Sequence, residues 1–174
     1  MSLSLSALTL QTFSSGLSTL SHILKKAQEH SPQDVDSKFA SARLIDDQLP
    51  LTFQVQVATN TVRKTLARLQ GRETSQDGLP HWEDNETTFA QLLERLEAAK
   101  DLVSKADAAK IDERADVEVE LPLGADNIFK LSCKDSVLKY SIPNFFFHIN
   151  TAYSILRAKG VPVGKRDYLG SFFA

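Results

Sequence analysis

Four stretches of the chain repeat apolar residues every three or four positions, and this spacing limits the fold more than any other feature of the sequence. Side chains spaced in this way line one face of an α-helix, so each stretch predicts an amphipathic helix that must bury that face. The four segments cover approximately residues 3–30, 51–70, 88–106 and 141–159. Together they predict an all-α fold, an antiparallel four-helix bundle.

Local signals mark the ends of these helices. The Ser31-Pro32 pair ends the first helix, because a residue before proline avoids the helical region. Gly71 is suited to stop the second helix and Gly160 the last one. Thr88 followed by Gln91 has the spacing of a capping box, which predicts the start of the third helix.

A change of period before the last helix predicts a small β-hairpin. Valine and leucine alternate with glutamate over residues 117–121, turn residues follow at 124–127, and apolar residues resume at 128. Nothing in the sequence suggests a second domain, and 42% hydrophobic residues are enough for one core. We therefore expect residues 1–174 to form a single domain.

Charge and composition exclude several classes of protein. The formal net charge is -2, from 20 Lys+Arg against 22 Asp+Glu, which leaves no basic surplus for nucleic acid. No stretch approaches the ~20 apolar residues that a membrane span needs. The amino-terminal segment carries no positive charge before Lys25, unlike a secretory signal, and the single cysteine, Cys133, excludes an internal disulfide. We expect a cytoplasmic protein.

Polar residues fall on the predicted inner face of the second helix. Gln54, Thr61 and Thr65 share the wide apolar side of this helix and should be at least partly buried. A buried glutamine must find partners for its oxygen and its NH2 group, because unpaired groups cost about 1–3 kcal/mol. Gln54 is therefore either a core residue bonded to a neighbouring helix or part of the lining of a pocket.

The last helix repeats this pattern. Asn144 and His148 lie one turn apart at the edge of its apolar face. A histidine there serves as a metal ligand, as a general base, or as a core residue bonded to a backbone carbonyl, and for a lone histidine the core role is the commonest. Tyr153, on the other flank, is able to pack its ring and keep its hydroxyl bonded.

The histidines do not suggest a metal centre. A catalytic zinc site needs three convergent protein ligands, and only His148 has an inward position. His81 lies in the predicted loop 71–85 and would have to swing in. His22 falls opposite the apolar face of the first helix and should be solvated. We predict no metal site and no cofactor.

Most charged residues mark outer faces. On the third helix the charged residues Glu94, Arg95, Glu97 and Lys100 are expected on a solvated surface with weak helical pairs. The group Lys165-Arg166-Asp167, in the tail after the last helix, has two interpretations. It either pins the tail to the bundle, which we consider the commoner arrangement, or presents an anion site.

Several runs of residues resemble a known family. The main ones are Pro143-Asn144-Phe145-Phe146-Phe147-His148 and Gly164-Lys165-Arg166-Asp167-Tyr168-Leu169-Gly170, and shorter matches occur in order at 42–44, 49–51, 54–56, 68–71, 86–89, 121–124, 151–153, 155–157 and 160–162. With these runs the chain resembles the DUF1993 family of the DinB-like superfamily, a family of bacteria and fungi without an assigned activity. The resemblance implies a DinB-like four-helix bundle.

The resemblance also implies where a site would lie. Better-known members of the superfamily are metal-dependent, thiol-using transferases and hydrolases, with one histidine from the second helix and a His-xxx-His pair from the last. This sequence has Gln54 and Gln56 on the second helix but no histidine, and Asn144 and Ala152 flank His148 at four residues on either side. The resemblance therefore implies a polar site between these helices without the metal triad.

Three functions follow from these observations. The first, which we favour, is a small-molecule pocket inside the bundle, in which His148 acts as general acid or base with help from Tyr153 and the ligand contacts Gln54, Asn144, Trp82 and Phe147. The second is a diverged metal-dependent transferase or hydrolase that uses His148, His81 and a carboxylate or glutamine. The third is a non-enzymatic binding module that forms a homodimer through the aromatic stretch 145–147 and the tail.

Overall fold

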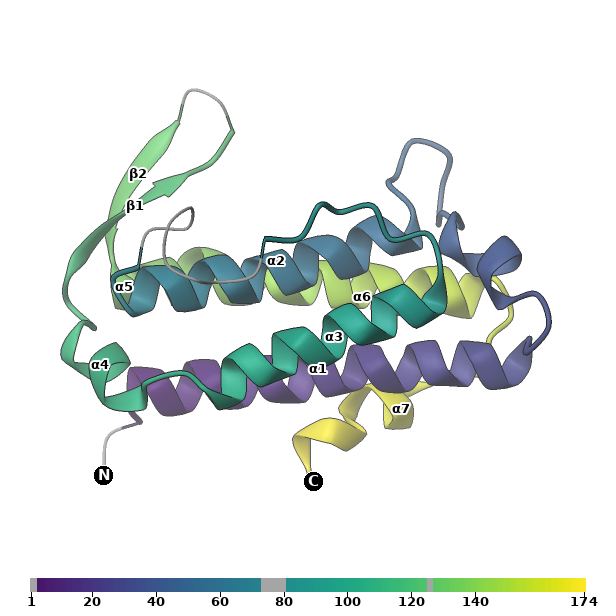
Figure 1. Ribbon diagram of the computed structural model, residues 1–174, viewed down its shortest axis with the longest axis horizontal. Helices are drawn as coiled ribbons and strands as arrows, with labels where there is room; N and C mark the ends of the chain where they lie inside the picture. Colours follow the sequence, from purple (N-terminus) through teal and green to yellow (C-terminus); the bar gives the residue numbers. More distant parts are fainter. Residues whose placement is uncertain (1–2, 73–80, 125–126) are drawn as a thin grey trace.

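The computed structural model describes residues 3–72, 81–124 and 127–174, and within them four long helices form a bundle (Figure 1). These helices are α1 (Leu5–His30), α2 (Leu51–Leu69), α3 (Phe89–Ser104) and α6 (Ile142–Ala158). The expected helical bundle is confirmed, and each long helix starts and ends close to the signals in the sequence. At α3, Thr88 and Gln91 form the predicted capping box.

The helices do not simply alternate in direction. α2 packs between α3 and α6, and α1 also packs against α3 and α6, so α1 and α2 lie on a diagonal. Figure 1 shows that α2 and α3 run the same way, opposite to α1 and α6. Hydrogen bonds at both ends agree: the Phe89 N–H donates to Asp36 near the start of α2, and the Asp107 N–H donates to Gln70 after its end. The antiparallel pairs are α1 with α3 and α2 with α6.

Close packing of aromatic side chains fixes α1 against α6. The rings of Phe13 and Phe145 meet edge to face with their centroids 5.0 Å apart, and both side chains are fully buried. Gly16 makes this approach fit, because a Cβ there would lie 2.4 Å from Phe145 Cε1. Any larger residue at position 16 would force the Phe145 and Ile149 side chains, or the two helices, to shift.

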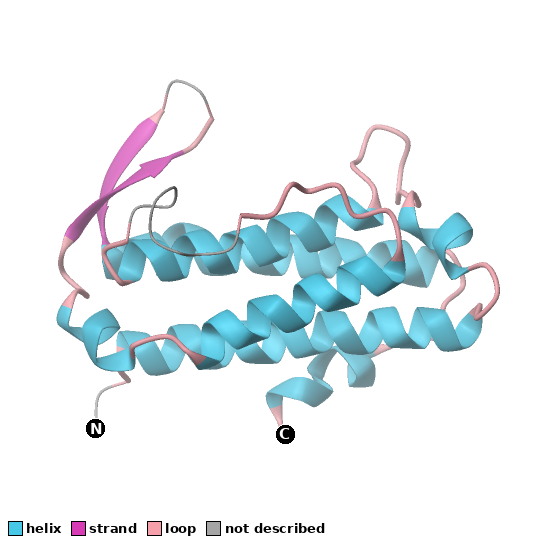
Figure 2. Cartoon of the chain, in the orientation of Figure 1, coloured by secondary structure: helices cyan, strands magenta, loops and turns pink. Residues whose placement is uncertain are grey.

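The predicted β-hairpin is present before the last long helix. Strand β1 (Glu118–Pro122) pairs with β2 (Ile128–Ser132) in antiparallel fashion, with Leu121 opposite Phe129. Figure 2 shows the hairpin standing out from one end of the bundle. Leu121 of β1 is buried and Val119 packs against the core, whereas Ile128 and Phe129 of β2 are exposed.

Shorter helical elements were not anticipated. They are the π-helical turn Asp36–Ala40, α4 (Ala108–Glu113), α5 (Cys133–Ser136), the π-helical turn Val137–Ser141, α7 (Lys165–Leu169) and the 3₁₀ turn Gly170–Phe172. Elements of this length have too few residues for a periodic pattern and depend on caps and tertiary packing. Asp107 caps α4 and Ser132 caps α5 through their side chains.

The π-helical turn Val137–Ser141 leads directly into α6. Its signature is the hydrogen bond from the Ile142 N–H to the Val137 carbonyl, five residues back. Ser141 Oγ donates to the Ser136 carbonyl at 3.2 Å and accepts from Thr65 Oγ1 of α2 at 2.9 Å. This turn therefore sets the rotation at which α6 meets α2.

The C-terminal tail folds back onto α1 (Figure 1), and an acid holds it there. Asp167 Oδ1 accepts hydrogen bonds from His22 Nε2 at 2.9 Å and Lys26 Nζ at 3.0 Å, while Oδ2 accepts from the Gly164 N–H. Burial alone would raise the pKa of Asp167, but these hydrogen bonds lower it well below its usual range. The tail is thus pinned through Asp167, and the neighbouring Lys165 and Arg166 are exposed.

None of the helices in the described residues is long and apolar enough to cross a membrane.

Candidate functional site

A hydrogen bond between α2 and α6 joins the two residues that the sequence placed inside the bundle. Gln54 is 2% exposed, and its Oε1 atom lies 2.8 Å from Nδ1 of His148. Its Nε2 donates to the Leu49 carbonyl at 2.8 Å. Because a carbonyl only accepts, this contact fixes the amide with its NH2 toward Leu49 and its oxygen toward His148.

The orientation of Gln54 also fixes the histidine. An amide oxygen accepts, so Nδ1 of His148 must carry the proton and donate it. In the neutral ring, Nε2 then holds a free lone pair. Burial lowers the pKa of His148 to about 4, so the ring is neutral at pH 7. The site thus presents a fixed hydrogen-bond acceptor.

Two phenylalanine rings flank this histidine. Phe53 lies with its centroid 6.2 Å from the His148 ring and Phe147 at 5.1 Å, both edge to face. The Phe147 side chain is 58% exposed, so the site is close to the surface. Nε2 of His148 forms no hydrogen bond within the described residues and is not among their enclosed polar atoms that lack a partner. The lone pair therefore opens outward between aromatic rings.

Further polar contacts continue along the same interface. Asn144 Nδ2 donates to Thr61 Oγ1 at 2.8 Å, and Thr61 in turn donates to the Val57 carbonyl. We call this line of residues the polar seam; its members are Gln54, Thr61, Thr65, Ser141, Asn144 and His148. The expected burial of the three α2 residues of the seam is confirmed, since they are 1–6% exposed.

The other predicted site residues have different neighbours. The ring of Tyr153 packs on Tyr168 of α7 with centroids 5.8 Å apart, and both line a shallow cleft of about 320 Å³ beside Lys165. Trp82 lies 4.6 Å above the guanidinium of Arg95. The structure thus brings together Gln54, His148 and Phe147, with Asn144 one turn away, but it gives Tyr153 and Trp82 separate surroundings.

The prediction that Arg95 is solvated is wrong. Arg95 is only 3% exposed. Its guanidinium donates hydrogen bonds to Thr59 Oγ1 and Glu86 Oε1, both at 2.7 Å, and also to Asp84 and the Gln56 carbonyl. The acids and Trp82 come from the segment 81–88, which runs alongside α2 and α3 (Figure 1). Helical spacing carries no information about a loop that covers a polar face, so no pattern in the sequence predicted this cluster.

The donor set at the seam does not fit the metal triad of the superfamily. Both polar atoms of the Gln54 amide are already bonded, and the Asn144 NH2 faces Thr61. Only the Nε2 atom of His148 remains as a nitrogen ligand there. Within residues 3–72, 81–124 and 127–174, no group of three His, Cys, Asp or Glu side chains is placed to hold a metal ion.

Comparisons with known proteins agree with the fold. The family model described as "Domain of unknown function (DUF1993)" matches residues 5–169. The crystal structure of a DinB family member protein from Shewanella denitrificans is similar with a TM-score of 0.83 and 36% sequence identity, covering 95% of this chain and 92% of that chain. The search of curated proteins finds no match.

Proposed function

The chain belongs to the DUF1993 family, and we propose that its polar seam is a binding site for a small organic molecule centred on His148. The observation that carries this proposal is the chain of contacts from the Leu49 carbonyl through the Gln54 amide to Nδ1 of His148. These contacts hold the lone pair of Nε2 in one direction before any ligand arrives, which reduces the ordering cost of binding.

The surroundings of His148 define what such a ligand must offer. Nε2 accepts a hydrogen bond, so the ligand needs a hydroxyl or an N–H group. Phe53 and Phe147 favour a flat or apolar body next to that donor. Asn144, one turn away on α6, is within the same interface and supplies a second polar contact for a longer ligand.

The pKa of His148 favours hydrogen-bond acceptance over acid catalysis. A ring with a pKa of about 4 carries no proton on Nε2 at neutral pH, so it has none to donate. If a reaction occurs here, His148 is its base and Gln54 its positioning residue. No step of this proposal uses a metal ion, because the seam offers one free imidazole nitrogen rather than three convergent ligands.

Phenol and anisole form a matched pair of probes for this site. Phenol has the aromatic ring and the donor, while anisole has the ring without the donor. We expect phenol to shift the ¹⁵N resonance of His148 Nε2 and to bind at least about tenfold more weakly to His148→Phe, a difference of about 1.4 kcal/mol. Anisole should bind both proteins equally, since the variant keeps an aromatic ring.

Phe147→Ala and Phe129→Ala provide the matched control. Both side chains are about half exposed, but Phe129 belongs to the hairpin. Only Phe147→Ala should weaken phenol. Equal phenol binding by His148→Phe and wild type would overturn the proposal. Light scattering of the same variants tests the alternative that Phe147 belongs to a dimer interface, because a loss of dimer in Phe147→Ala alone would favour it.

A further inference from the structure

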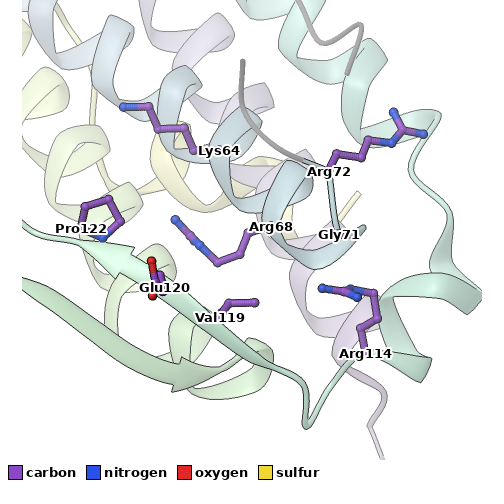
Figure 3. Close-up of a pocket in the computed structure, with 8 residues that line it drawn as sticks. All are labelled: Lys64, Arg68, Gly71, Arg72, Arg114, Val119, Glu120 and Pro122. Carbon is purple, nitrogen blue, oxygen red and sulfur yellow. The ribbon is translucent and has the colours of Figure 1, made fainter. Parts of the chain in front are cut away.

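A cleft lies at the C-terminal end of α2, the end opposite Gln54. There this helix meets the end of α4 and strand β1 (Figure 3). Its volume is about 470 Å³, within the range of small-molecule sites. The lining residues are Lys64, Arg68, Gly71, Arg72, Arg114, Val119, Glu120 and Pro122. We propose that this cleft binds a small phosphorylated molecule.

The charge of the cleft differs from that of the whole chain. Its lysine and three arginines outnumber Glu120, although the formal net charge of the protein is -2. Within the described residues no carboxylate forms an ion pair with any of these four cations. Cations that gather without acidic partners around a concave, partly desolvated surface attract an anion more strongly than dispersed surface charges do.

Arg68 gives the most direct indication of a missing partner. Its Nη1 atom is enclosed without a hydrogen-bond partner among the described residues, whereas Nε and Nη2 are not enclosed, and burial lowers the pKa of this guanidinium. An arginine side chain stays protonated in proteins, so an enclosed N–H without an acceptor is costly. A phosphate oxygen in the cleft would accept from the open Nε or Nη2 atom of this guanidinium and offset part of the cost of burying its charge.

Arg114 places a second guanidinium in a defined position. Its Nε donates to the Leu69 carbonyl at the end of α2, at 3.0 Å. Gly71, with φ of +66°, lies directly beneath: a Cβ there would come 2.8 Å from Arg114 Cζ. The bare backbone at Gly71 therefore accommodates the guanidinium, and its charge is fixed on one side of the cleft before a ligand binds.

The geometry favours phosphate over a carboxylate. Figure 3 shows Lys64 and Arg68 reaching from α2 and Arg114 approaching from the end of α4, so positive charges come to this cleft from two elements, whereas the guanidinium of Arg72 points away from them. A tetrahedral phosphate presents oxygens in several directions and carries up to two charges, whereas a carboxylate presents a single edge. Glu120 is exposed on β1 and is free to turn into water when an anion enters.

Isothermal titration with pyrophosphate, inorganic phosphate and succinate tests this proposal. We expect pyrophosphate to bind most tightly. The dissociation constant of succinate should be at least about tenfold higher than that of pyrophosphate. Binding should weaken as salt is added, because the contacts are ionic. Tighter binding of succinate than of both phosphates would overturn the assignment of ligand class.

Three variants locate the binding. Arg68→Met and Lys64→Met should each weaken pyrophosphate several-fold, the first about tenfold or more, while Lys25→Met on the exposed face of α1 should leave it unchanged. Lys64 is exposed, so its replacement does not threaten the fold. The proposal fails if Lys64→Met and Arg68→Met bind pyrophosphate like wild type, or if wild type shows no binding at about 10 mM in low salt. His148→Phe should not affect it.

Discussion

Two buried polar clusters lie on opposite sides of α2, and they differ in how completely their hydrogen bonds are satisfied. On the α3 side, each guanidinium nitrogen of Arg95 has an acceptor from α2 or from the segment 81–88. On the α6 side, His148 has one nitrogen bonded to Gln54 and the other unpaired within the described residues. A satisfied cluster fixes structure, whereas a cluster with one free, oriented acceptor has capacity left for a ligand.

The charges of the two clusters differ as well. The guanidinium of Arg95 holds carboxylates beside it, so the pKa of Glu86 is lowered: burial opposes the shift, and hydrogen bonds from Arg95 and Gln56 outweigh it. His148 has no charged partner in the described part of the chain, and burial lowers its pKa to about 4 and so keeps the ring neutral. The first cluster is therefore an ionic clamp for the loop, and the second is a neutral site.

We expect the largest loss of stability from a substitution that removes the ionic clamp at Arg95. Arg95→Met leaves Glu86, Thr59 and a backbone carbonyl without their buried donor, and we expect it to lower the free energy of unfolding by about 4 kcal/mol. Urea denaturation followed by fluorescence of Trp82, the single tryptophan, reports this directly. Lys105→Met, which breaks an exposed helical pair, should change stability by less than about 1 kcal/mol. A loss from Arg95→Met no greater than that of the control would contradict the clamp.

The next largest effect is a change of stability with pH that results from the lowered pKa of His148. Its pKa is about 4 in the folded protein, against an ordinary value of 6.5, so the unfolded chain takes up the proton first as pH falls. The stabilisation from the neutral ring is complete above about pH 6.5 and is lost as pH falls through 4, a change of about 3 kcal/mol.

Comparison of wild type with His148→Gln isolates this contribution. The difference in unfolding free energy between the two proteins should change between pH 7 and pH 4 in favour of the variant. In proton NMR the Cε1–H signal that disappears in His148→Gln should titrate near pH 4. A midpoint close to 6.5 would show that the ring is solvated and would remove the contrast between the two clusters.

The smallest effect comes from the middle of the polar seam. Asn144→Ala removes the donor to Thr61, but the Thr61 hydroxyl keeps its bond to the Val57 carbonyl, so we expect a loss of only about 1 kcal/mol. Asn150→Ala, on the exposed face of the same helix, should cost less than about 0.5 kcal/mol. A loss above about 3 kcal/mol for Asn144→Ala would mean that the seam is as tightly coupled as the clamp.

The sequence was informative where one element carries the whole signal. Helical spacing placed Gln54 and His148 on inner faces of their helices, and the capping signal at Thr88 located α3, because these are properties of a few successive residues. The resemblance to the DUF1993 family then indicated that these two helices are neighbours. Together these signals predicted that Gln54 and His148 face the same interior space, and the structure adds their direct hydrogen bond.

The sequence was uninformative where distant segments meet. Arg95 has the position of a solvated residue on its own helix, and it becomes buried only because the segment 81–88 covers it. The basic cleft combines the end of α2 with α4 and β1, which no local pattern relates. Tyr153 likewise has its partner, Tyr168, in a tail whose path the spacing of α6 does not determine.

The π-helical turn before α6 determines on which side His148 emerges. A single residue added to a regular helix advances everything after it by about 100° around the axis, and this turn contains such an added residue. Deleting one residue between Val137 and Ser141 would carry His148 away from Gln54 and replace it at the α2 interface with a different side chain. A related chain with a shorter or longer turn here would therefore place a different side chain at the α2 interface of an almost identical fold. The length of this turn in a relative's sequence thus indicates whether that relative has the same arrangement of residues.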